Sequence, residues 1–181
     1  ASGARYLAKD VLQAIYRAEL GVTQTTQLSE RVLELYQLPD VEALLYNQTS
    51  LNAKAIHVHE GKITRVLLDS ADEGDEVAIG VLEHHATLLA NTALVAIRNT
   101  ALEAPFPVVF SGGVFKHPSP LLREAIVRRL RKYHKDIEVI SSQREPVLGA
   151  LLLAFEATRN LSETTLARLE ASLPPTSFFE T

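Results

Sequence analysis

The first part of the chain carries apolar side chains at the three- and four-residue spacing that is typical of amphipathic helices. Glycine and proline interrupt this pattern at intervals, and Asp40 stands where its carboxylate can cap a helix. The pattern predicts helices from about Tyr6 to Gly21, from Leu28 to about Leu38, and from Asp40 through Tyr46.

The segment 47–61 is harder to interpret, because Ile56–His59 alternates like a strand while its flanks do not. We expect a loop or a ragged helix there. Helical spacing returns at Ile63, and the polar run 72–75 predicts a break followed by the N-cap of a long helix that ends near Asn99. The buried stripe of this long helix is expected to be Ala78, Val81, Leu82, Leu88, Leu89, Thr92 and Val95.

The last third of the chain contains two short apolar runs, each followed by a helical pattern. Pro107–Phe110 is predicted to be a buried strand that stops at Ser111-Gly112-Gly113, and 137–140 is predicted to be a second strand. Ser119 is expected to cap the helix between them, with Pro120 at its first position. The helix between the strands is expected to have an apolar face made of Leu121, Leu122, Ala125, Ile126 and Leu130. After the second strand, an apolar helix is predicted from Pro146 through Ala154 and an amphipathic helix from Ser162 to Leu173.

The order strand, helix, strand, helix predicts a βαβα unit with parallel neighbours joined by a right-handed crossover. Two parallel strands alone do not make a stable free-standing sheet, so we expect the remaining strands to lie outside this chain. The expected fold class is α/β, mostly helical in this piece, with parallel strands near 107–111 and 137–141. The chain is expected to comprise a helical region (residues 1–103), a βαβα region (residues 104–160), and a C-terminal helix and tail (residues 161–181).

Composition narrows the chemistry of this 181-residue chain, of which 46% is hydrophobic. It contains no cysteine, which excludes thiolate metal sites, iron–sulfur clusters and cysteine nucleophiles within it. It has neither a membrane-length apolar run nor an apolar export segment, so we expect a cytoplasmic protein that does not bind a membrane. It has no methionine either, which suggests a processed chain or an excised domain.

The net charge of −4 argues against a nucleic-acid partner. One basic cluster falls at the predicted end of the helix that follows the first strand, where it complements the negative end of the helix dipole. Its members are Arg128, Arg129, Arg131, Lys132 and Lys135.

The pair Gly112-Gly113 follows the first strand at the point where open α/β sheets bind ligands, the carboxyl end of a parallel strand. Two residues without Cβ allow a flat ring or a sugar phosphate to approach the backbone closely, and the helix near Pro120 adds free N–H groups. An adenine nucleotide suits both features. A tight turn with no ligand would explain the same two glycines.

Four segments give this turn a wider context. They are Gly3-Ala4-Arg5-Tyr6-Leu7, Glu73-Gly74-Asp75 followed by Ala78, Val109 through Phe115, and Pro146-Val147-Leu148-Gly149-Ala150. In this order and spacing they resemble the N-acetylglucosamine kinases and the BadF/BadG/BcrA/BcrD-type ATPases of the actin, hexokinase and heat-shock-chaperone superfamily. The resemblance covers nearly the whole chain.

This resemblance implies that residues 1–181 form the C-terminal, nucleotide-binding lobe of a two-lobed, ribonuclease-H-like kinase that uses ATP and Mg²⁺. It implies that Gly112 and Gly113 contact the nucleotide, with Val114, Phe115 and Lys116 nearby. The family's phosphate loops and catalytic acid are not found in this sequence, so we expect no catalytic residue and no metal ligand in this chain. The expected partners are a sugar substrate and the N-terminal lobe of the same protein, and a homodimer is left open.

Three functions are compatible with these observations. The leading hypothesis is a hexosamine kinase that transfers the γ-phosphoryl group of ATP to a sugar hydroxyl, with this chain alone inactive. The second is an activating ATPase of the acyl-CoA reductase or dehydratase type, which the missing cysteines disfavour. The third is a non-catalytic module that senses a sugar or a nucleotide.

The histidines offer other candidates. His57 and His59 could share a metal, but no carboxylate cluster accompanies them. Adjacent residues of a helix point in different directions, so His84 and His85 are not expected to share a ligand, and partial burial is the simpler interpretation. His117, like Lys116, could reach a phosphate or ribose, although a solvated loop is favoured for both.

Acidic residues near the helix starts are not given a catalytic role. Capping is the expected role of Asp72, Glu73 and Asp75. Arg5 and Asp10 lie where related kinases approach the sugar; Ala4-Arg5 departs from the family's usual pattern, which leaves the identity of the sugar open.

Overall fold

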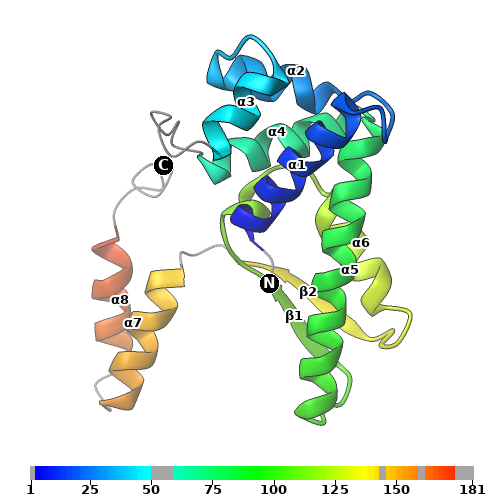
Figure 1. The fold of residues 1–181 in the computed structure, drawn as a ribbon. Coiled ribbons are helices and arrows are strands. Elements are labelled where there is room, and N and C mark those ends of the chain that lie inside the picture. The colour runs from blue at the N-terminus through cyan, green and yellow to red at the C-terminus, as the bar shows by residue number, and fades with distance from the viewer. Residues whose placement is uncertain (1–2, 50–58, 143–145, 159–161, 174–181) are drawn as a thin grey trace. The chain divides into compact units, whose positions relative to one another are not determined.

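The computed structural model describes residues 3–49, 59–142, 146–158 and 162–173, and the chain divides into two compact units, 1–141 and 142–181. In the first unit, a group of helices is followed by two strands with a helix between them, and the second unit contains two helices (Figure 1). The first unit contains α1 (Ala4–Glu19), α2 (Gln27–Tyr36), α3 (Val41–Thr49), α4 (Glu60–Asp72), α5 (Glu76–Asn99), β1 (Phe106–Phe110), the 3₁₀ turn η1 (Gly113–Lys116), α6 (Leu121–Leu130) and β2 (Ile137–Ser141). The second contains α7 (Pro146–Ala157) and α8 (Glu163–Ala171).

The predicted helices are confirmed, with boundaries that differ by a few residues. Gly21 follows α1 with a φ of +68°, a conformation that favours glycine, and the Ala43 N–H donates to Asp40 Oδ1 at 2.7 Å at the start of α3. In the segment 47–61, α3 continues to Thr49 and α4 begins at Glu60, while the strand-like residues 56–58 lie outside the described residues.

The capping prediction for Asp75 is confirmed, and its carboxylate also serves a second helix. Oδ1 accepts from the Ala78 N–H at 2.8 Å, which caps α5. Oδ2 accepts from the Gln27 N–H at 2.7 Å, and both oxygens lie within 3.0 Å of Thr26 Oγ1. Thr26 in turn accepts from the Leu28 N–H at 3.1 Å, so one nearly buried carboxylate joins the N-termini of α2 and α5.

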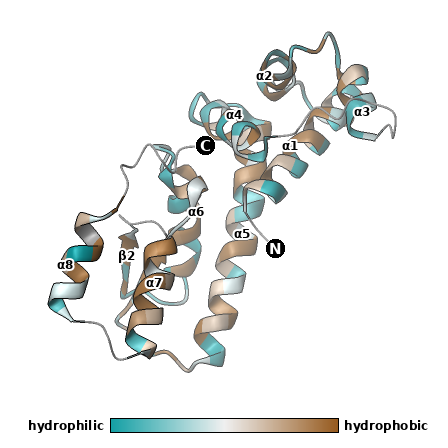
Figure 2. Cartoon of the chain, turned by 90° about the vertical axis from the view of Figure 1, so that its left-hand side faces the viewer, coloured by the Kyte–Doolittle hydropathy of each residue, from teal (hydrophilic) through white to brown (hydrophobic). Residues whose placement is uncertain are grey.

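The predicted stripe of α5 is correct at its start and wrong further along. Ala78 and Leu82 are buried, but Leu88, Thr92 and Val95 are exposed. The step of six residues from Leu82 to Leu88 turns about 240° around a helix, so it leaves the buried face. The residues of α5 that are buried are Ala78, Leu82, His85, Ala86, Ala90 and Ile97, which follow the three- and four-residue spacing. Figure 2 shows the mixed hydropathy of this helix along its length.

The two strands are parallel as predicted, with Phe106 opposite Ile137 and Phe110 opposite Ser141. The expectation of a buried first strand is correct for one face only. Phe106 and Phe110 join the core formed with the helices, whereas the Val109 side chain between them is 56% exposed. Mixed helices with a small parallel sheet are compatible with an α/β fold.

The helix after β1 starts one residue later than expected. Pro120 lies just ahead of α6 instead of at its first position, and Ser119 Oγ accepts from the Leu121 N–H at 3.4 Å. Its predicted apolar face is confirmed, with Leu122, Ala125, Ile126 and Leu130 buried. None of the helices among the described residues is long and apolar enough to cross a membrane.

The start of the basic cluster is paired within the fold. Glu83 of α5 accepts from Arg128 at 2.5 Å and from Arg129 at 2.7 Å, both in the last turn of α6. Partial burial alone would raise the pKa of Glu83, but hydrogen bonds and charge from the two arginines outweigh it and hold the pKa below the usual value. These pairs join α5 to α6 and favour a structural role for this section of the cluster.

A pH-dependent contribution to stability follows from the lowered pKa of Glu83. Because the folded-state pKa lies below the unfolded one, the contribution is present above the unfolded value, near 4.5, and is lost as pH falls through the folded value. We expect Glu83→Gln to lower the melting temperature at pH 7 and to have progressively less effect between pH 5 and pH 3. Thermal unfolding of both proteins across this range measures the difference, and a constant difference would contradict the assignment.

Candidate functional site

The glycine turn after β1 has an open backbone. Gly112 adopts a φ of +109°, which other residues rarely accept, and Gly113 begins η1. No atom from outside their immediate chain neighbours lies within 4 Å of the position that a Cβ would take at either glycine. The backbone of the turn is therefore uncovered on this side, as it is at the other glycines of the chain.

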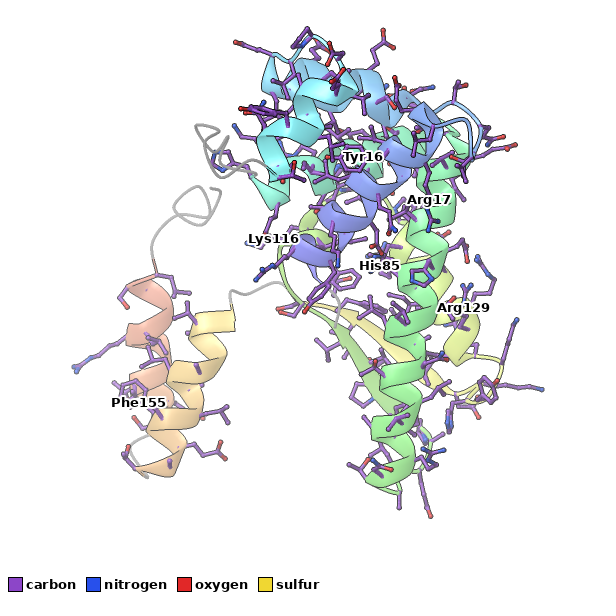
Figure 3. All side chains as sticks on the ribbon, in the orientation of Figure 1. Tyr16, Arg17, His85, Lys116, Arg129 and Phe155 are labelled. Atoms are coloured by element: carbon purple, nitrogen blue, oxygen red, sulfur yellow. The ribbon has the colours of Figure 1, made fainter. Side chains whose placement is uncertain are left out.

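The side chains next to the two glycines hold the turn in place. Phe115 packs edge-to-face on Phe110, with ring centroids 5.0 Å apart, and its N–H donates to the Gly112 carbonyl at 3.1 Å. Val114 and Phe115 are half-buried against the core. Lys116 is exposed at the end of the turn (Figure 3).

The segment after the turn is tied to α4. His117 Nε2 lies 3.1 Å from Asp69 Oδ1, and the Ser119 N–H donates to His117 Nδ1 at 3.2 Å. Since Nδ1 accepts, the ring proton is on Nε2 and is donated to Asp69. Ser119 Oγ donates to Asp72 Oδ1 at 2.7 Å. His117 is therefore not the solvated loop residue that was favoured from the sequence.

Arg123 is a candidate residue that the sequence analysis missed. The parallel register places the ends of β1 and β2 at one edge, with Phe110 beside Ser141. From the first turn of α6, Arg123 donates to Ser141 Oγ at 3.0 Å, so a cation lies at the carboxyl edge of the sheet. The signal was available, because a helix that follows a parallel strand begins near that edge.

A pair between a buried histidine and a partly exposed aspartate joins α1 to α5. His85 is 1% exposed, and its Nε2 lies 2.8 Å from Asp10 Oδ2, while its buried Nδ1 has no hydrogen-bond partner within the described residues (Figure 3). His85 is therefore more buried than the sequence suggested. His84 is exposed, and the two rings meet edge-to-face, so the expectation that they point in different directions is confirmed. Arg5 lies 3.9 Å from Glu60 on the surface.

The remaining polar candidates have structural partners, adjoin a helix, or lie outside the described residues. Glu73, immediately after α4, pairs with Arg31 in the middle of α2. His57 lies outside the described residues, whereas His59 immediately precedes α4. Within the described ranges, no group of three or more histidines and carboxylates gathers at metal-binding distance.

Comparison with known proteins gives one further constraint. No family model matches the chain. Over 155 residues the chain is 23% identical to an N-acetyl-D-glucosamine kinase of Dictyostelium discoideum, and the alignment covers 83% of this chain. It covers 47% of that kinase, so the chain spans about half the length of the curated relative it matches. The similarity supports a sugar-kinase-like relationship.

Proposed function

We propose that the chain is the C-terminal, nucleotide-binding portion of an ATP-dependent sugar kinase with a ribonuclease-H-like fold, acting on N-acetylglucosamine or a related hexosamine. One observation carries this proposal: the open backbone at Gly112 and Gly113 lies at the carboxyl end of a parallel strand, where open α/β sheets bind ligands. The chain is also similar to an N-acetyl-D-glucosamine kinase. The hexosamine is inferred from the name of the relative.

In this proposal the adenosine moiety of ATP rests on the glycine turn. The absence of Cβ atoms lets the ring or ribose approach the backbone, and Phe115 fixes the turn from the core side. Arg123 lies at the same edge of the sheet and supplies positive charge there. These residues bind and orient the nucleotide; none of them is assigned a proton-transfer role.

Mg²⁺ would be held chiefly by the phosphate oxygens of ATP, as is usual for this ion. The groups that act on the γ-phosphate and on the sugar hydroxyl would come from the N-terminal lobe. The chain by itself is then expected to bind nucleotide weakly and to phosphorylate no sugar.

The proposal is tested by titrating the chain with MgADP while following its backbone amides by NMR. We expect weak binding, with a dissociation constant of about 1 mM, and shifts concentrated at Ser111–Lys116. Shifts that are absent from this segment would contradict the proposed site. Sugar phosphorylation by the isolated chain at a rate on the order of 1–100 s⁻¹ would contradict the proposal that the catalytic groups come from the N-terminal lobe.

A matched pair of glycine variants separates binding from folding. A methyl group at Gly113 meets no protein atom within 4 Å, so Gly113→Ala should fold normally, yet it occupies the space proposed for the nucleotide. We expect it to weaken MgADP binding about tenfold, which corresponds to roughly 1.4 kcal/mol. Gly80→Ala, equally open but on α5, should leave binding unchanged and stabilise the helix by up to about 1 kcal/mol. Equal MgADP affinity in both variants would contradict the site.

A further inference from the structure

Two carboxylates on one helix hold the chain immediately after the glycine turn. Asp69 and Asp72 are three residues apart on α4, so both project from the same side of that helix. Asp69 pairs with His117, and Asp72 accepts from Ser119 Oγ. The helix also packs against η1 itself.

The histidine has little freedom to reorient. Its side chain is 11% exposed, and each of its ring nitrogens makes a hydrogen bond, one to Asp69 and one to the Ser119 N–H. Rotation of the ring would break both bonds. Its carboxylate partner is 48% exposed, so this bond is accessible to solvent on one side only.

The glycine turn depends on such neighbours for its shape. Gly112 and Gly113 have no side chains with which to fix their own backbone, and glycine has more conformations open to it than any other residue. Phe115 anchors η1 on one side through its contact with Phe110. The bond between His117 and Asp69 holds the residue that immediately follows η1.

We propose that Asp69 and His117 are positioning residues that hold the glycine turn in the conformation that accepts the nucleotide. Neither residue has to touch the nucleotide to do so. The effect on nucleotide binding rests on the proposed function. The restraint that Asp69 and His117 place on the glycine turn does not, because it is present in the chain without a ligand. Binding sites depend on such supporting contacts, because a backbone that samples several conformations is in the binding conformation for only a fraction of the time.

The test compares variants along one helix. Asp69→Ala removes the acceptor of the His117 bond, whereas Asp69→Asn keeps a neutral acceptor in the same place. Glu73→Ala is the matched control, because Glu73 lies four residues after Asp69, immediately after the end of α4, and its replacement removes a surface pair with Arg31 that does not involve the glycine turn. Each protein is measured twice: amide hydrogen exchange at Phe115 and Ser119 without nucleotide, and the affinity for MgADP.

We expect Asp69→Ala to speed exchange at both amides by about threefold to tenfold, the usual effect of losing one such hydrogen bond, and to weaken MgADP binding by a similar factor. Asp69→Asn should recover most of both losses, and Glu73→Ala should change neither. His117→Ala is expected to reproduce the effect of Asp69→Ala at the Phe115 amide, which guards against a local effect of the aspartate on α4. Its effect at Ser119 is expected to be larger, because it also removes the Nδ1 acceptor of that amide.

Different results overturn different statements. Unchanged exchange at Phe115 in Asp69→Ala would refute the hold on the turn, whatever the nucleotide does. Faster exchange with unchanged MgADP affinity would refute the positioning role. If the unaltered chain shows no MgADP shifts at Ser111–Lys116, the proposed function fails, and the positioning role fails with it, while the exchange data still decide whether the two residues hold the turn.

Discussion

Replacing Asp75 with alanine is expected to lower the free energy of unfolding by about 2–4 kcal/mol, since an N-cap is worth about 1 kcal/mol and the donors at the start of α2 that lose their acceptor add about 1–3 kcal/mol together. The carboxylate caps α5 through the Ala78 N–H. It also accepts from Thr26 and from the Gln27 N–H at the start of α2. Because Asp75 is 8% exposed, water replaces these bonds poorly. Urea denaturation followed by circular dichroism measures the loss.

Asp40→Ala provides the matched control. Asp40 also caps a helix, α3, through a single bond of 2.7 Å to the Ala43 N–H, but it is exposed and serves that helix only. We expect this variant to cost about 1 kcal/mol or less. Equal losses in Asp40→Ala and Asp75→Ala would show that the link between α2 and α5 contributes nothing beyond an ordinary cap.

The features that sequence predicts well are those that neighbouring residues determine. Helix starts at Asp40 and Asp75 were found because a capping side chain bonds N–H groups two or three residues away. The parallel pairing of two strands, near 107–111 and 137–141, was also predicted, since a strand, helix, strand order favours a parallel crossover. The glycine turn was predicted in the same way, because two adjacent glycines directly follow an apolar strand.

The features that sequence missed depend on partners far along the chain. Asp75 was expected to cap one helix, and its bond to Thr26 joins residues 49 positions apart. His117 was expected in a solvated loop, but Asp69, 48 positions earlier, holds it. Asp10 and His85 are 75 positions apart, and nothing in either local pattern indicates the pair.

The predicted buried stripe of α5 was wrong for a different reason, because the periodicity was extended past the residues that face the core. A pair of substitutions tests which leucines are buried. Sequence periodicity placed both Leu82 and Leu88 on the buried face, whereas Leu82 is 2% exposed and Leu88 is 39% exposed. Leu82→Ala is expected to lower the free energy of unfolding by about 2–5 kcal/mol, because it removes apolar contacts and leaves a cavity. Leu88→Ala should cost about 0.5 kcal/mol or less, since a partly exposed leucine loses little and alanine is the better helix former.

The two substitutions remove the same atoms from the same helix, so helix propensity cancels between them and the difference reports burial alone. Urea denaturation of both variants measures that difference directly. A loss in Leu88→Ala as large as that in Leu82→Ala would mean that the side of α5 bearing Leu88 is covered in solution. The buried face would then be wider than the run of Ala78, Leu82, His85 and Ala86. A small loss in both would mean that the packing of α5 against α4 and α6 contributes less than its burial indicates.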